Sequence, residues 1–195
     1  MAAAKLLHAR GFQVILQMMT GLPGADPASD LRTAELLADL RPEGVRIYPT
    51  LVLRDTPLAA LWERGEYRAK TLEEAVETCA PIVELFQKRG IPVLRLGLHP
   101  SRELEAKLLA GPYHPALGEL VYSRLYRNTA ERLLSASKTL PASVTLLVHR
   151  GGVSKLTGQG RGNLLWLRSR FGLEELRVAE GDLPPGSIAI AGDIE

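Results

Sequence analysis

Two stretches of the sequence contain residues that could bind a ligand at the end of a parallel sheet. The first, Gln17–Gly24, follows an apolar run at 12–16 and ends in the turn Gly-Leu-Pro-Gly. The second, Arg46–Leu53, lies where the next strand is expected to end. Ligands of parallel α/β folds gather beyond the carboxyl ends of the strands, so the two stretches together predict one site. Taken alone, a turn of glycine and proline is more simply explained as an ordinary strand-to-helix loop.

Arg46 is the charged residue of an otherwise apolar strand. It lies two residues before Tyr48, so the two side chains are expected to share a face. A charge on a buried strand is costly unless it is paired. We therefore expect Arg46 to line a cavity and to face a carboxylate or phosphate. Tyr48 is equally well explained as a core residue, and Gly21 as a residue of the turn alone.

The elements that would position these residues alternate between helix and strand. Strands are expected over 12–19, 45–48 and 91–98, and helices over 2–10, 102–110 and 116–136. Three further helices are expected to begin at capping residues, namely Ser29, Thr56 and Thr71, the last in a capping box with Glu74. This alternation predicts a parallel sheet. Three strands alone would leave the edge at 12–19 open, so we interpret 1–137 as the latter part of a larger barrel or sheet.

The last part of the chain, 138–195, is expected to form a small α/β appendage. Its expected elements are strands at 144–148, 176–178 and 188–190 and a helix at 164–171. The glycine-rich segment Gly158–Asn163 precedes that helix. Such a segment can bind phosphate through its backbone N–H groups, or it can serve only as a flexible loop.

Basic residues concentrate around this appendage. Residues 122–172 contain nine lysines and arginines but a single acidic residue, Glu131. A block with this imbalance is a candidate surface for binding a polyanion. The candidate contacts to an RNA backbone are Arg150, Lys155 and Arg161.

Composition excludes several classes of protein. The 195 residues are 46% hydrophobic and 24% charged, as in an ordinary globular protein of one domain with or without an appendage. No apolar run approaches the roughly 20 residues that span a bilayer, and the first residues do not resemble a signal peptide. We therefore expect a cytoplasmic protein with no membrane partner. The one cysteine, Cys79, and four histidines without ligand spacing predict no metal site within this chain.

Four blocks of the sequence resemble one known family. They read LQMMTGLPG, VRIYPTLVLRDTPLAALWERGEYR, PVLRLGL and GPYHPALGELVYSR. In this combination they resemble the latter half of radical S-adenosylmethionine (SAM) proteins, in the branch that includes the Elongator catalytic subunit and, more distantly, the oxygen-independent coproporphyrinogen III oxidases. The resemblance covers 1–137, with a weaker likeness of 140–195 to the C-terminal extension of bacterial members. It implies the last three strands of a partial (β/α) barrel, followed by a small basic α/β extension at 138–195.

The resemblance also implies part of a SAM site. In the family's pattern Gln17 occupies the polar position at the strand end, and Met19 the apolar position beside the adenine. Gly21 and Gly24 allow close approach of the backbone. The expected cofactor-binding set is Gln17, Met19, Gly21, Gly24, Arg46, Tyr48 and Pro49, of which Pro49 faces the adenine with its backbone.

One departure from the family's pattern limits the expected activity. The family holds a [4Fe–4S] cluster on Cys-x3-Cys-x2-Cys, which this sequence does not contain. Without thiolate ligands there is no cluster to reduce SAM. We therefore expect the C-terminal portion of a radical SAM enzyme of RNA (tRNA) modification, inactive alone, whose cluster comes from an N-terminal half or a partner subunit.

Two other interpretations remain open. A non-catalytic RNA-binding module could retain the scaffold without the chemistry. A small α/β enzyme could bind a phosphate ligand at the Gly21–Gly24 turn, although the sequence offers no paired base and nucleophile for it.

Overall fold

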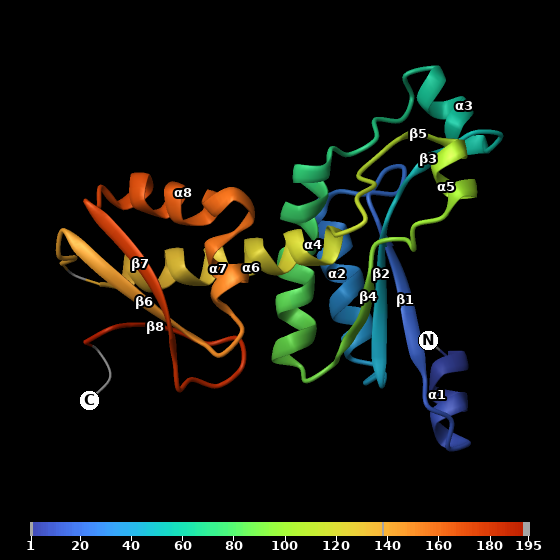
Figure 1. Cartoon of the computed structure of the whole chain (residues 1–195). Coiled ribbons are helices and arrows are strands. Elements are labelled where there is room, and N and C mark those ends of the chain that lie inside the picture. The colour runs from blue at the N-terminus through green and yellow to red at the C-terminus, as the bar shows by residue number, and fades with distance from the viewer. Residues whose placement is uncertain (1, 138, 193–195) are drawn as a thin grey trace. The chain divides into compact units, whose positions relative to one another are not determined.

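The computed structural model of the chain describes residues 2–137 and 139–192 (Figure 1). It consists of two compact units, Met1–Gly118 and Glu119–Glu195, which are described separately. Helix α6 (Leu117–Ala136) begins at the junction of the units, and the boundary inferred from the sequence falls at the other end of this helix. None of the described helices is long and apolar enough to cross a bilayer.

The first unit is built on a parallel sheet of three strands in the order β1-β2-β4. The strands are β1 (Ile15–Thr20), β2 (Gly44–Pro49) and β4 (Val93–Leu96). Helices α2 (Pro27–Ala38) and α4 (Leu72–Lys88) pack against each other and on one face of this sheet (Figure 1). This confirms the predicted α/β fold with three parallel strands, and β1 is an open edge of the described sheet.

The buried face of the sheet explains why these segments fold as they do. Val45 and Ile47 are fully buried, and α4 places Phe86, Ile82 and Val83 against the interior at helical spacing. Burial of each such side chain contributes about 1.5–3 kcal/mol. Pro81 lies inside α4, which continues to Lys88, so this proline does not end the helix.

The remaining elements of the first unit are short. Helix α1 (Ala2–Ala9) precedes the sheet, and α3 (Pro57–Glu63) and α5 (Arg102–Lys107) follow β2 and β4. Strand β3 (Val52–Leu53) pairs antiparallel with β5 (Leu108–Ala110). This pair was not predicted, and β5 replaces the end of the helix that was expected over 102–110.

The start of α2 also differs from the prediction. Its N-cap is Asp26 rather than Ser29, because the Asp26 carboxylate accepts the Ser29 N–H at 2.6 Å. The Ser29 hydroxyl accepts the Asp26 N–H at 2.9 Å in return. Pro27 then occupies the first helical position, where its missing N–H costs nothing.

The second unit has its own sheet, in the order β7-β6-β8. Strand β6 (Ser143–His149) pairs parallel with β7 (Glu175–Gly181) and antiparallel with β8 (Ile188–Ile190). Between β6 and β7 lie α7 (Val153–Thr157), a short 3-10 turn (Gln159–Arg161) and α8 (Gly162–Phe171). The core joins leucines of α7 and α8 to the inward side chains of β6, namely Leu156, Leu164, Leu167, Val144, Leu146 and Val148.

The capping box of α4 generates a prediction about acid stability. The Arg68 guanidinium and the Thr71 N–H lower the pKa of Glu74 from its ordinary 4.5 to about 2. A carboxylate whose pKa is lower in the folded state stabilises the fold above pH 4.5, and loses this effect as the pH falls towards 2. In urea unfolding, Glu74→Gln should be less stable than the unchanged chain at pH 7, and the difference should shrink below pH 4.5. A difference independent of pH would contradict this account.

Candidate functional site

Four of the predicted cofactor residues lie together on the uncovered face of the first sheet. Gln17 pairs in register with Arg46, and Met19 with Tyr48. Side chains paired across parallel strands share a face, so these four form one surface. Gln17 and Arg46 are exposed, Met19 is 40% exposed and Tyr48 is half-buried, whereas the alternate residue Met18 is buried against the helices. The Arg46 side chain is therefore exposed on this face, and the cavity and the carboxylate or phosphate that we expected beside it stay a prediction.

The turn after β1 is held by hydrogen bonds at both sides of Gly21. The buried Asp30 carboxylate accepts the Gly21 N–H at 3.0 Å, and the Tyr67 hydroxyl donates to the Gly21 carbonyl at 2.7 Å. Gly21 and Gly24 have φ of +73° and +76°, the left-handed region that glycine enters without cost. The glycines of the predicted motif therefore serve a defined backbone conformation.

A lysine fills the space behind this turn. Lys70 Nζ lies 3.5 Å from the Asp30 carboxylate and donates to the Thr78 hydroxyl at 3.0 Å. A Cβ atom added to Gly21 would lie 3.2 Å from the Lys70 side chain, so there is little room for a larger residue. Tyr67 is nearly buried, and burial together with the charge of Asp30 raises the pKa of its phenol. It therefore remains a hydrogen-bond donor at neutral pH.

The strand ends are joined to one another beside the turn. Thr50 donates to the Thr20 carbonyl from both its backbone N–H, at 2.9 Å, and its hydroxyl, at 2.8 Å. Pro49 ends β2 and is buried. The ends of β1 and β2 are thus fixed relative to each other, which a site spanning both strands requires.

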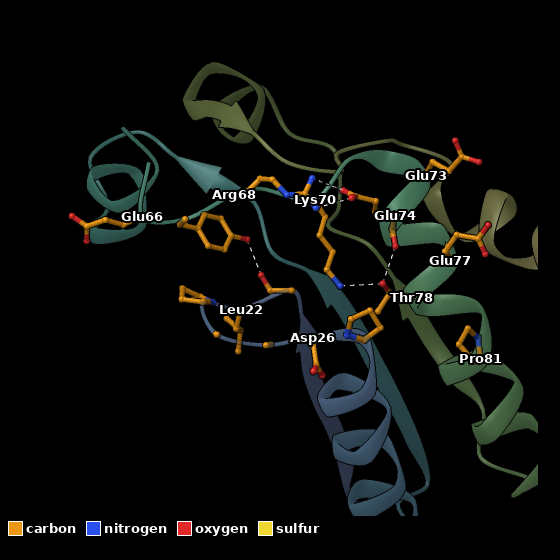
Figure 2. Close-up of a pocket in the computed structure, with 16 residues that line it drawn as sticks. Leu22, Asp26, Glu66, Arg68, Lys70, Glu73, Glu74, Glu77, Thr78 and Pro81 are labelled. Carbon is orange, nitrogen blue, oxygen red and sulfur yellow. Dashed lines mark hydrogen bonds and ion pairs between the residues drawn. The ribbon is translucent and has the colours of Figure 1, made fainter. Parts of the chain in front are cut away.

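A cavity of about 750 Å³ lies beside the Gly21–Gly24 turn (Figure 2). The Gly21–Pro27 segment, residues 66–70 and the first turns of α4 line it. Acidic residues of α4, including Glu73 and Glu77, border it, as Figure 2 shows. It shares only Gly21 and Gly24 with the predicted cofactor residues, so it is distinct from the open sheet face.

The cysteine of the chain is unsuited to bind iron. Cys79 is fully buried in α4, with its sulfur 3.9 Å from the Thr20 hydroxyl. Burial raises the pKa of its thiol to about 11, so it is protonated at neutral pH. Cluster ligands are thiolates, and therefore the residues present do not fit a [4Fe–4S] group.

The three candidate RNA contacts of the second unit occupy different surroundings. Arg150 is exposed in the turn after β6. The Lys155 ammonium of α7 lies 5.6 Å from the centre of the Tyr122 ring. Arg161, at the start of α8, has a left-handed backbone and lines a groove with α8 and β7. Lys138, counted in the basic block, lies outside the described residues.

Comparison with known proteins supports a family assignment for a large part of the chain. Residues 42–127 match the family model described as Radical_SAM C-terminal domain. A tRNA uridine(34) acetyltransferase of Methanocaldococcus jannaschii is 32% identical over 130 residues, 65% of this chain and 23% of that protein. Elongator complex protein 3 of Mus musculus is 32% identical over 119 residues, 59% of this chain and 21% of that protein. The chain carries an Elongator-like radical SAM C-terminal domain.

A solved structure agrees with this assignment. The archaeal Methanocaldococcus infernus Elp3 with an N-terminal deletion has a TM-score of 0.54 and 28% identity, and the match covers 65% of this chain and 30% of that one. The likeness confirms the predicted family and the partial-barrel architecture. The matched region spans less than a quarter of the length of each curated relative named above.

The sequence reasoning missed several residues that lie at the predicted site or hold the turn beside it. Tyr67 and Asp30 hold the glycine turn from 46 and nine residues away, and no spacing rule connects them to Gly21. Arg95 was also missed. It pairs in register with Arg46, is exposed, and contacts His99 Nδ1 at 3.3 Å. A charged residue inside the apolar run at 93–98 was the available signal, the same one that identified Arg46.

The two hydrogen bonds that hold Gly21, from its N–H to Asp30 and to its carbonyl from Tyr67, are called the Gly21 clamp. The clamp predicts how removal of the Tyr67 hydroxyl would change the stability of the fold. Tyr67→Phe would leave the buried Gly21 carbonyl without this donor, at a cost of about 1–3 kcal/mol in the free energy of unfolding. Tyr113→Phe is the matched control, because Tyr113 donates to the exposed Glu105 carboxylate at 2.8 Å. Urea unfolding should show a loss for Tyr67→Phe that clearly exceeds that for Tyr113→Phe. Equal losses would mean that the clamp does not stabilise the turn.

Proposed function

We propose that this chain is the C-terminal part of a radical SAM enzyme of tRNA modification and that its open sheet face binds part of SAM. The observation that carries the proposal is the grouping of Gln17, Met19, Arg46 and Tyr48 on one uncovered face, beside the fixed glycine turn. The printed names of the relatives, a tRNA uridine(34) acetyltransferase and Elongator complex protein 3, support tRNA as the substrate class. Such a protein would act in the cytoplasm.

The chemistry of the four side chains suits the cofactor. A guanidinium pairs well with a carboxylate, so Arg46 would hold the carboxylate of the methionine moiety. The Gln17 amide would hydrogen-bond a polar group of the same moiety. Met19, Tyr48 and the backbone of Pro49 would border the adenine, and Gly21 and Gly24 would let the backbone approach closely. In this enzyme class SAM supplies the radical chemistry.

The cluster would come from another stretch of protein. Cys79 cannot hold it, and the open edge of β1 offers unpaired backbone groups to a further strand. We propose that a cluster-bearing N-terminal half or partner subunit adds to this edge and completes the barrel. This chain's own residues then bind and orient the cofactor and close one side of its site.

A binding test addresses the cofactor site directly. In an NMR titration of the full chain with SAM, the Met19 methyl signal should shift. Arg46→Ala should weaken binding by about tenfold, as expected for loss of a hydrogen bond to a charged group. Arg89→Ala is the matched control, because Arg89 is an exposed arginine that pairs with Asp39. The assignment would be refuted if the NMR signals that shift came only from the cavity that α4 borders. It would also be refuted if Arg46→Ala and Arg89→Ala weakened SAM binding equally.

A second test addresses the need for a partner. The 195 residues, treated anaerobically with iron, sulfide and dithionite, should retain no cluster and release no 5′-deoxyadenosine from SAM. Absorbance near 400 nm and chromatography of the products measure the two results. Cleavage of SAM by this chain alone would show that the inference from its single cysteine is wrong.

A non-catalytic RNA-binding module is the alternative function. The excess of basic residues over 122–172 favours it, since this charge would remain useful without the radical chemistry. In that case Arg150, Lys155 and Arg161 would carry RNA contacts, whereas SAM would not bind.

A further inference from the structure

In the second unit a glycine-rich loop joins two helices, and these helices lie between two strands in chain order. Strand β6 leads into α7, the loop Gly158–Arg161 joins α7 to α8, and α8 leads into β7. Strands β6 and β7 are parallel neighbours. KH modules use a glycine loop in a setting of this kind to clamp about four nucleotides of single-stranded nucleic acid by their backbone.

The loop is held rigidly by a buried amide. Asn163 is buried, and its side-chain NH2 donates to the Lys155 carbonyl at 3.2 Å and to the Ser123 carbonyl at 3.0 Å. A Cβ atom on Gly158 would lie 2.8 Å from the Asn163 side chain, so the loop closes tightly onto this amide. Gln159, Gly160 and Arg161 remain exposed. The exposed loop is therefore preformed for a ligand that contacts its backbone.

A groove of about 520 Å³ begins at this loop and runs between the helices and β7. Arg161, Leu165 and Arg168 line one wall of it, at spacings of four and three residues that place them on one face of α8. Leu165 is 59% exposed, although it is a large apolar residue. Val178 of β7 also lines the groove. The groove thus combines an apolar stripe with two guanidinium groups.

The charge of the groove is positive after its internal pairs are counted. Arg177 forms two hydrogen bonds of 2.8 Å with Glu175, so that pair is neutral. Arg168 uses Nε to donate to the Leu173 carbonyl at 3.3 Å, which orients the guanidinium but does not neutralise it. Arg161 forms no ion pair with any residue that the structure describes. An anionic ligand with flat apolar groups is complementary to this surface.

Arg161 has a backbone conformation that is costly for a residue with a long side chain. Its φ is +63°, a region that favours glycine over every residue with a branched or long side chain. Glycine at this position would remove the conformational cost, and the arginine that stands here lines the groove.

We propose that this groove is a binding site for single-stranded RNA of about four nucleotides, with Arg161 and Arg168 on phosphates and Leu165 against a base. The proposal deepens the proposed function and rests on it for RNA as the ligand. It assigns contacts to Leu165 and Arg168, and it places Lys155, which faces Tyr122, outside the groove. Arg150 is likewise absent from its lining.

Fluorescence anisotropy of the full chain with a labelled 12-nucleotide single-stranded RNA tests the proposal. Arg161→Gly and Arg168→Ala should each weaken binding by about fivefold to tenfold. The double variant should flatten the dependence of log K on log salt by about 1.4, since each phosphate contact to a single strand contributes about 0.7. Arg170→Ala is the matched control, because Arg170 is an exposed arginine of α8 that lies outside the groove lining and faces Glu131 at 3.7 Å.

A stability measurement separates binding from folding. Arg161→Gly should leave the melting temperature unchanged or raise it, because glycine adopts this φ without strain. An affinity lost at full stability supports a direct contact. An affinity unchanged in Arg161→Gly and Arg168→Ala, or lowered equally in Arg170→Ala, would overturn the proposal.

The choice of competitors tests the kind of ligand. Single-stranded RNA should compete better than duplex RNA and better than polyglutamate of equal charge. Preference for the duplex, or equal competition by polyglutamate, would overturn the assignment to single strands. The assay contains no SAM and Arg46→Ala should bind RNA normally, so failure of the cofactor proposal would not affect the result.

Discussion

The geometry of the first unit depends on how one peptide segment is held. Gly21 lies where β1 becomes the turn to α2, and its N–H and carbonyl are bonded to Asp30 and Tyr67. Lys70 compensates the buried Asp30 carboxylate, which would otherwise be a costly unpaired charge. Thr50 joins the neighbouring strand end to the same place. The strand end is thereby positioned by residues of three different segments, and the side chains of Gln17 and Met19 are presented from a rigid base.

The sheet has an open face because the helices that pack on it, α2 and α4, lie on the same side. Helices α2 and α4 cover one face, where Met18, Val45 and Ile47 are buried. The other face keeps polar and apolar side chains in solvent, including Arg46 and Ile15, which is 49% exposed. In a complete barrel this face would line the interior. A completed barrel would explain why a strand carries an arginine and large apolar residues on the face that α2 and α4 leave uncovered.

Much of this fold could be predicted from the sequence, because its signals are local. Glycine and proline mark the turns, and the Thr71 capping box with Glu74 fixes the start of α4. The cap of α2 was misplaced because Asp26 and Ser29 are both good caps, and only the hydrogen bonds decide between them. The antiparallel pair β3–β5 joins segments more than 50 residues apart in short strands that have no periodicity to read. The placement of Arg46 and Tyr48 on one face could be predicted, because it depends on strand alternation alone. Tyr67 and Asp30 were beyond reach, since their roles arise from tertiary contacts alone.

The exposed edge of β1 has a consequence for how this chain behaves at different concentrations. Backbone donors and acceptors along Ile15–Thr20 face outward on one side, and the same strand in a second molecule carries the same unpaired groups. Two molecules can therefore satisfy these groups mutually, by strand pairing across a symmetric contact. A strand from the rest of the proposed barrel would compete for that position. Self-association and completion of the barrel would then exclude each other, and dilution would shift the balance away from the self-paired form.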